Sequence, residues 1–136
     1  MAASNILMEI ILNNLQKKIP IPRAKILKTA QTACRKLGVK GSLSIVFVGA
    51  RRMRTSNKKY LGHDYVTDVL TFDLGEGHAE IIICPRVAHS YAKDHQTSTE
   101  KEIILYVIHG ILHLAGYDDH TPQDIDRMRR MEKELI

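Results

Sequence analysis

Residues 97–120 read TSTEKEIILYVIHGILHLAGYDDH, and this stretch decides both the fold and the candidate site. Thr97 and Glu100 have the spacing of a capping box, which predicts the start of a helix. The helix that follows is apolar on nearly every side, so we expect it to be buried at the centre of the fold. His109 and His113 are four residues apart and therefore lie one turn apart on the same face of this helix.

The residues after the second histidine favour a metal site over two buried, hydrogen-bonded histidines. Gly116 predicts the end of the helix, because glycine readily takes the left-handed conformation found there. The chain then turns back and carries Asp118, Asp119 and His120 toward the imidazoles. Two ligands from a rigid helix and a third from the next turn make an open site, in which zinc keeps a fourth position for water or substrate.

The spacing is related to the metzincin pattern H-E-x-x-H-x-x-G-x-x-H of zinc proteases. His109, His113 and Gly116 match it, and Asp119 stands at the position of the last histidine. Gly110 replaces the glutamate that acts as general base in a protease. A site of this kind without that base is not expected to be an efficient peptidase.

The charge of the chain is unevenly distributed. Residues 1–60 hold 13 Lys or Arg against one acidic residue, a net +12, whereas residues 61–136 hold 7 against 14, a net −7. A basic half beside an acidic, histidine-rich half favours a polyanion bound on one surface. Ordinary solvated lysines are the alternative, since few aromatic residues are present for base stacking, and Tyr60 and Tyr117 are assigned to packing.

The length of the chain and its use of cysteine limit the classes of protein to which it can belong. We expect one domain over residues 1–136 with a single core. No apolar run approaches the ~20 residues of a membrane span, and no signal-peptide pattern is present. Cys34 and Cys84 lie far apart without a CxxC motif, which predicts neither a disulfide framework nor a thiolate zinc site. This usage is typical of a reducing cytoplasm, the expected location.

Hydrophobic periodicity and chain breakers predict four strands and five helices. The strands are expected over 5–13, 42–48, 69–74 and 80–84, with residues 75–78 as a hairpin loop. Besides the helix opened by Thr97, helices are expected from Pro22 to Gly38, over 51–60, over 85–95 and from Pro122, capped by Thr121, to the C-terminus. These elements predict an α+β fold in which a small four-stranded mixed sheet is packed with helices and a central buried helix carries the metal site.

Three segments of the sequence carry a resemblance to a known family: the run 109–120, the segment TDVLTF at 67–72, and Asn57 with Tyr60 before it. Together they resemble the bacterial YbeY family, the metal-dependent endoribonucleases of ribosomal RNA maturation. The family pattern is H-G-x-L-H-L-x-G-Y-D-H preceded by T-D-V-L-S-F, and the similarity covers nearly the whole chain. Met128 and Glu132 also fall where the last helix of the family has these residue types.

The resemblance implies a small sheet packed with helices around a three-ligand zinc site, with one ion per chain. It also implies cleavage of single-stranded RNA, in maturation of the 3′ end of small-subunit ribosomal RNA and in ribosome quality control. The expected partners are therefore single-stranded RNA, ribosomal RNA and the small ribosomal subunit. No association with a membrane is expected.

The chain departs from the family pattern at three places. Aligned without a gap, the third histidine of the family falls on Asp119, with His120 one step later. A carboxylate oxygen binds zinc at nearly the distance of an imidazole nitrogen, so Asp119 is favoured and His120 remains the alternative. Leu61 stands where the family commonly has an arginine thought to hold substrate phosphate. Ala79 and Glu80 stand where the family usually has Gly-Asp.

We assign the remaining candidate residues as follows. Asp118 is predicted to be the general base, with a helix cap or turn residue as the alternative. Asp68 and Glu80 are predicted to orient the imidazoles, with strand-end turns as the alternative. Whether water or the RNA 2′-hydroxyl attacks is left open. The RNA backbone is expected to lie along Arg51, Arg52, Arg54, Lys58 and Lys59.

Two other functions fit parts of the pattern. A metal hydrolase of peptides or another small substrate would share the ligands, but Gly110 argues against a peptidase. A non-catalytic ribosome-associated protein would hold zinc structurally. Structural zinc sites usually have four protein ligands, so that interpretation requires Asp119 and His120 to bind the same ion.

Overall fold

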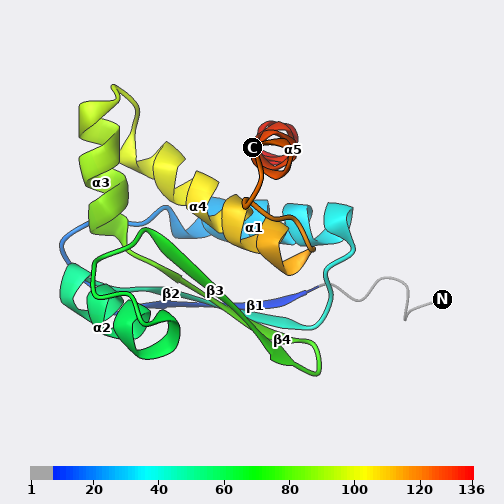
Figure 1. Cartoon of the computed structure of the whole chain (residues 1–136), viewed down its shortest axis with the longest axis horizontal. Coiled ribbons are helices and arrows are strands. Elements are labelled where there is room, and N and C mark those ends of the chain that lie inside the picture. The colour runs from blue at the N-terminus through cyan, green and yellow to red at the C-terminus, as the bar shows by residue number, and fades with distance from the viewer. Residues whose placement is uncertain (1–7) are drawn as a thin grey trace.

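The computed structural model describes residues 8–136, which form a four-stranded sheet and five helices (Figure 1). No helix in this part of the chain is both long enough and apolar enough to cross a bilayer. The predicted α+β class is confirmed. In chain order the elements are β1 (Glu9–Asn14), α1 (Arg23–Leu37), β2 (Ser42–Phe47), α2 (Ala50–Leu61), β3 (Val69–Gly75), β4 (His78–Ile83), α3 (Pro85–Asp94), α4 (Thr99–Leu114) and α5 (Pro122–Leu135).

The sheet is mixed, as the sequence predicts. Its strand order is β1-β2-β4-β3, in which β1 pairs with β2 and β2 with β4 in parallel, while β3 and β4 form an antiparallel hairpin. This order leaves β3 at one edge of the sheet. The outer side of β3 is therefore not paired with another strand and is open to the groups around it.

The two faces of the sheet pack against different helices. Along β2, Leu43, Ile45 and Phe47 belong to one core cluster, whereas Val46 and, just after the strand, Val48 belong to the other, as strand alternation requires. The first cluster includes buried residues of α1, α4 and α5, and the second includes Met53 of α2. Figure 1 shows α1, α4 and α5 on one side of the sheet and α2 on the other. Helix α4 thus lies between the sheet and α5, which explains why it is apolar nearly all round.

Helix α4 starts one residue later than its sequence pattern indicates. The cap is Ser98, whose side-chain oxygen accepts a hydrogen bond from the backbone N–H of Lys101 at 3.1 Å, rather than Thr97. Thr97 is instead tied to the preceding turn, where its N–H donates to the carbonyl of Ala92. At the other end Gly116 has φ +98°, so the predicted left-handed turn after the helix is confirmed.

The other boundaries fall close to those expected. Strand β1 covers Glu9–Asn14 instead of 5–13, and residues 5–7 lie outside the described part of the chain. Pro22 caps α1 rather than opening it. Strand β4 begins at His78 rather than at residue 80, because His78 is already paired with Ser42 of β2.

Both cysteines are buried core residues, which predicts low reactivity. Cys34 is 1% exposed and Cys84 is not exposed at all. Burial raises the pKa of the Cys34 thiol to about 11, and burial is also the largest cause of the raised pKa of Cys84. Since the thiolate is the reactive form, we expect neither cysteine to react with Ellman's reagent in the native protein at pH 8. Both should react once the protein is unfolded in guanidinium; rapid labelling before unfolding would contradict the burial.

Candidate metal centre

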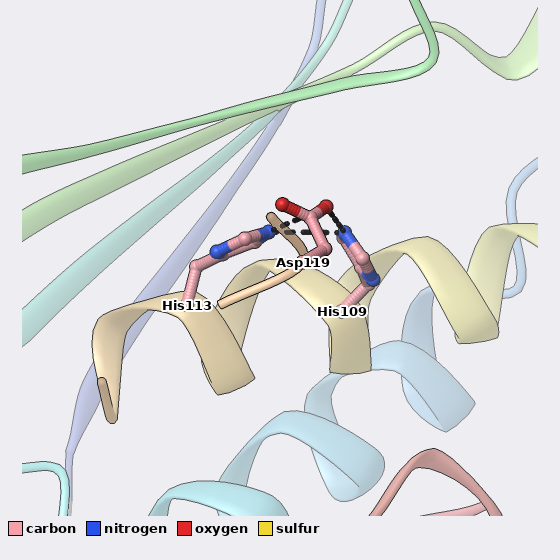
Figure 2. Close-up of side chains that lie close together, drawn as sticks. All are labelled: His109, His113 and Asp119. Carbon is pink, nitrogen blue, oxygen red and sulfur yellow. Dashed lines mark hydrogen bonds and ion pairs between the residues drawn. The ribbon is translucent and has the colours of Figure 1, made fainter. Parts of the chain in front are cut away.

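Three side chains from α4 and the loop after it converge on one point. His109 and His113 extend from one face of α4, and Asp119 reaches back over them from the loop before α5 (Figure 2). One ligand atom from each of the three lies within 4.8 Å of the other two. The arrangement follows directly from the sequence, because helical spacing aligns the histidines and the turn at Gly116 reverses the chain.

The distances within this group suit a tetrahedral metal ion. The two Nε2 atoms are 3.1 Å apart, and Oδ2 of Asp119 lies 3.6 Å from Nε2 of His109 and 3.5 Å from Nε2 of His113. Ligands bound to zinc at about 2.0–2.2 Å in a tetrahedron are separated by roughly 3.3–3.6 Å. Two imidazoles and one carboxylate are also an established type of zinc donor set. The residues present therefore fit zinc with three protein ligands and one open position.

A carboxylate from α5 fixes the orientation of the first imidazole. Oε2 of Glu132 accepts a hydrogen bond from Nδ1 of His109 at 2.8 Å, and both side chains are mostly buried. An ionised carboxylate only accepts hydrogen bonds, so the ring proton resides on Nδ1. The lone pair of a neutral His109 is then on Nε2, the nitrogen that faces His113 and Asp119. Glu132 thus selects the tautomer that a metal ligand requires.

The surrounding charges also control the protonation of His109. Burial lowers its pKa, but the hydrogen bond that His109 donates to Glu132 and the negative charges of Glu132, Asp119 and Asp68 outweigh burial, so the pKa is raised above its usual value. The metal-free protein therefore binds a proton at His109 at higher pH than a free histidine does. Because an imidazole must be neutral to bind a metal, metal affinity should fall as the pH falls through this raised pKa.

Two hollows open around the candidate centre. The first, which we call the β3-side hollow, has a volume of about 580 Å³ and is lined by β3, the loop before it, and the His109, His113 and Asp119 group. The second, the α5-side hollow, measures about 710 Å³ and lies between α3, α4 and α5. His109 and Asp119 line both, whereas His113 lines only the first. The centre is thus accessible to a ligand larger than water.

The structure separates the two candidates for the third ligand. Asp119 belongs to the converging group, while His120 is exposed and lines the β3-side hollow without joining that group. Asp118, predicted to be the general base, is exposed and lines neither hollow, so that role stays a prediction. With three converging donors among residues 8–136, the geometry is that of an open site rather than a closed four-ligand one.

The two acids predicted to orient the imidazoles lie in different places. Asp68 lines the β3-side hollow, and its Oδ1 accepts the backbone N–H of Val69 at 2.7 Å, as a strand-end turn residue does. Glu80 is not brought to the histidines. Its neighbours Ile81 and Ile83 face α4, so alternation along β4 directs Glu80 to the α2 side of the sheet. The predicted orienting role of Glu80 does not agree with this geometry, and Glu132 occupies that role instead.

The predicted phosphate-binding residues gather on α2, although one of them is already paired. Nε of Arg54 lies 2.8 Å from Oδ1 of Asp64, and this exposed ion pair joins α2 to the loop that follows. Arg52 does not line the shallow hollow on this helix. The residues that do are Arg51, Arg54, Thr55, Lys58, Lys59 and Asp64.

The sequence analysis named Glu132 only as a residue type shared with the last helix of the family and assigned it no role at the site. The available signal was its position on α5: Met128 and Leu135 are buried, and Glu132 lies one turn after Met128 on the same face. An acidic residue on the apolar face of an amphipathic helix requires a partner. The sequence alone does not identify that partner, because the contact depends on how α5 packs across α4.

Removal of the Glu132 carboxylate should weaken metal binding without abolishing it. We expect Glu132→Ala to lower zinc affinity by about 10- to 100-fold, the usual effect of losing a hydrogen-bond partner of a ligand histidine. Glu132→Gln should lose less, because its amide oxygen still accepts the Nδ1 proton. Competition with a chromophoric chelator measures both affinities, and Glu134→Ala on the exposed side of α5 is the matched control. Equal affinities for all four proteins would exclude the role.

The comparisons with known proteins identify the family of the chain. The sequence model of the family described as Endoribonuclease YbeY matches residues 11–136. This chain belongs to the YbeY endoribonuclease family. Endoribonuclease YbeY of Chlorobium luteolum is 41% identical over 97 residues, covering 69% of this chain and 71% of the relative. That of Chlorobium phaeovibrioides is 35% identical over 133 residues, covering 95% and 89%.

A solved structure extends the agreement to three dimensions. The solution structure of TM1509 from Thermotoga maritima superposes with a TM-score of 0.61 at 26% sequence identity, over 94% of this chain and 88% of that one. The similarity to the family stated from the three motifs is thereby confirmed. Membership of this YbeY family identifies the chain as a hydrolase that acts on RNA.

Proposed function

We propose that this YbeY-family protein is a metal-dependent endoribonuclease of single-stranded RNA. We further propose that it acts in the cytoplasm on the small ribosomal subunit, in maturation of the 3′ end of its RNA and in ribosome quality control. The observation that carries metal dependence is the group of His109, His113 and Asp119, with donor distances of 3.1–3.6 Å, all three of which line the β3-side hollow. Zinc, or another divalent ion, would be held by these three residues.

The bound ion would supply a Lewis acid that polarises a phosphate oxygen and offsets the negative charge developing on the phosphorus. The chain itself supplies position. Glu132 keeps the His109 proton on Nδ1, and α5 packed on α4 holds that pair rigid. The β3-side hollow gives the RNA backbone access along the open edge of the sheet. Phosphates flanking the cleaved bond are assigned to Arg51, Lys58 and Lys59, which have no ion pair among the described residues.

The two other functions have less support. Three converging donors give no reason to prefer a structural zinc site, which usually has four. A peptidase would require a general base at the position of Gly110, where the helix packs against Ile81.

The test is cleavage by chelator-treated protein with and without added metal. We expect no cleavage of a labelled single-stranded RNA after chelation, recovery on addition of zinc or manganese, and little cleavage of the same sequence as a duplex. His113→Ala should remain inactive at every metal concentration. The ends of the products, phosphate or cyclic phosphate, identify the attacking group. Full cleavage by metal-free protein, or cleavage of casein but not of RNA, would refute the proposal.

A further inference from the structure

A group of aromatic side chains is exposed at the end of α2 and in the loop that follows it. Tyr60 is 56% exposed and Tyr65 is 54% exposed. The ring of His63 lies parallel to that of Tyr65, with centroids 5.5 Å apart and an interplanar angle of 12°. We call Tyr60, His63 and Tyr65 the aromatic rim. Tyr60 was assigned to packing, but only its contact with Phe72, at a centroid distance of 5.3 Å, fits that assignment.

The loop that carries the rim is held in place by a buried polar residue. Asn57 is only 1% exposed, and its side-chain amide donates a hydrogen bond to the carbonyl oxygen of Tyr65 at 3.0 Å. The backbone N–H of His63 donates to the carbonyl of Asn57 at 3.3 Å. The ion pair between Arg54 and Asp64 adds a third tie between α2 and the loop. The rings are therefore presented to solvent from an anchored backbone, which lowers the entropy lost when a ligand stacks on them.

The charge around the rim is positive. Nζ of Lys59 lies 5.2 Å from the centre of the Tyr60 ring, and the hollow lined by Arg51 and Lys58 is on the same helix. Exposed aromatic faces beside cations are the two components of surfaces that bind single-stranded nucleic acid: bases stack on the rings and phosphates lie near the cations. An apolar protein partner would not require the surrounding lysines and arginines.

The aromatic rim is continuous with the candidate metal centre. Leu61 follows Tyr60 directly and lines the β3-side hollow together with His109 and His113. At the other end of the loop, Thr67 and Asp68 line the same hollow. Because β3 is the edge strand, no further strand lies between the rim and the histidines on this side of the sheet, and an RNA strand bound at the rim can extend past β3 to the histidines.

We propose that the aromatic rim stacks unpaired bases of the RNA on one side of the cleaved bond, an inference that rests on the proposed RNA-cleaving function. Only bases free of a duplex can place their faces on Tyr60 and Tyr65, so the rim favours single-stranded substrate. The rim also gives the RNA a contact surface beside Leu61, a residue that carries no charge with which to bind a phosphate. Stacking is tolerant of sequence, since every base has an aromatic face.

The test measures binding of a single-stranded RNA that contains 2-aminopurine to the zinc-loaded protein. We expect 2-aminopurine fluorescence to change on binding to wild type and Tyr65→Trp, and the affinity of Tyr65→Ala to fall roughly 5- to 100-fold. Tyr65→Leu, which keeps apolar area but cannot stack, should behave like Tyr65→Ala. Zinc content should be the same in all variants. Tyr91→Ala, which removes an exposed ring of the α5-side hollow, is the matched control and should bind like wild type.

The outcomes separate this inference from the proposed function. If wild type cleaves single-stranded RNA and Tyr65→Ala or Tyr65→Leu binds as well as wild type, stacking on the rim is excluded while the function stands. If Tyr91→Ala alone weakens binding, the RNA enters by the α5-side hollow and the inference is overturned. If wild type neither binds nor cleaves RNA, the proposed function itself is refuted, and the inference that depends on it is refuted as well.

Discussion

Asp119→Ala should remove the metal from the protein and RNA cleavage with it, whereas His120→Ala should leave both nearly unchanged. The carboxylate of Asp119 is 3.5–3.6 Å from both histidine Nε2 atoms, while His120 lies outside the converging group. Loss of a direct ligand costs more than loss of its hydrogen-bond partner, so we expect zinc affinity to fall by more than about 100-fold in Asp119→Ala. Cleavage at limiting zinc should fall in parallel.

The fold should survive the Asp119 substitution, so the loss can be assigned to the site. The Asp119 side chain is 42% exposed, and no hydrogen bond within the described residues depends on it. Elemental analysis of dialysed protein, thermal unfolding of the metal-free forms and a single-stranded RNA assay make up the measurement. Asp119→His is an informative third variant, since it restores the donor type of the family pattern and should retain metal.

Other rankings of the two variants lead to different conclusions. Loss at His120 with retention at Asp119 would move the third ligand by one residue and require the loop after Gly116 to adopt another path. Loss of zinc in both would indicate four protein ligands, a closed site and a structural ion. Measuring Asp119→Ala beside His120→Ala therefore decides which of the two residues is the third ligand, and also whether the site is that of an enzyme or of a non-catalytic protein.

The parts of this site that the sequence predicts are those set by local geometry. A helix aligns His109 with His113 whatever surrounds it, and Gly116 at φ +98° turns the chain within a few residues. Asp119 is reachable from that turn. These three positions could be identified because every constraint on them acts over about ten residues of sequence.

The parts that could not be predicted depend on packing between distant segments. Glu132 meets His109 only because α5 crosses α4 in one particular direction. Glu80 was placed near the histidines by its similarity to a family acid, but its face of β4 was not decided until the register with β2 and β3 was known. A shift of one residue along a strand reverses the direction of every side chain, so sequence similarity cannot replace register.

The exposure of the aromatic rim also could not be predicted from the sequence. Tyrosine is found in cores and on surfaces alike, and the loop after α2 has no periodicity from which burial can be inferred. Asn57 was noted as part of a family motif, and the structure gives its physical role: a buried amide that anchors the loop at Tyr65.

Gly110→Glu, which restores the glutamate of the metzincin pattern, should unfold the protein rather than create a peptidase. Gly110 is buried where α4 crosses β4, and a Cβ there would lie 2.8 Å from Cδ1 and 3.0 Å from Cγ2 of Ile81. Ile81 is itself fully buried and has little freedom to withdraw. Overpacking of this kind costs about 1–3 kcal/mol, and an unpaired buried carboxylate adds about 3–5 kcal/mol.

A loss of that size is comparable with the whole stability of a domain, about 5–15 kcal/mol. We therefore expect Gly110→Glu to be largely unfolded by circular dichroism and gel filtration. Gly110→Ala should be folded and destabilised by no more than about 2 kcal/mol in urea, because the clash is partly offset by the higher helix propensity of alanine, about 1 kcal/mol. Lys101→Glu, at an exposed position of the same helix, is the matched control and should change stability by less than about 0.5 kcal/mol.

The same variants decide why this helix can bind a metal without acting on peptides. The position next to the first histidine packs against Ile81 of the sheet and does not line the β3-side hollow, so a glutamate there would be buried in that contact rather than directed at a substrate in the hollow. The absence of that base is then a consequence of packing the helix directly on the sheet. A stable Gly110→Glu protein would show that the sheet can yield at this point, and casein cleavage by it would return the peptidase interpretation to consideration.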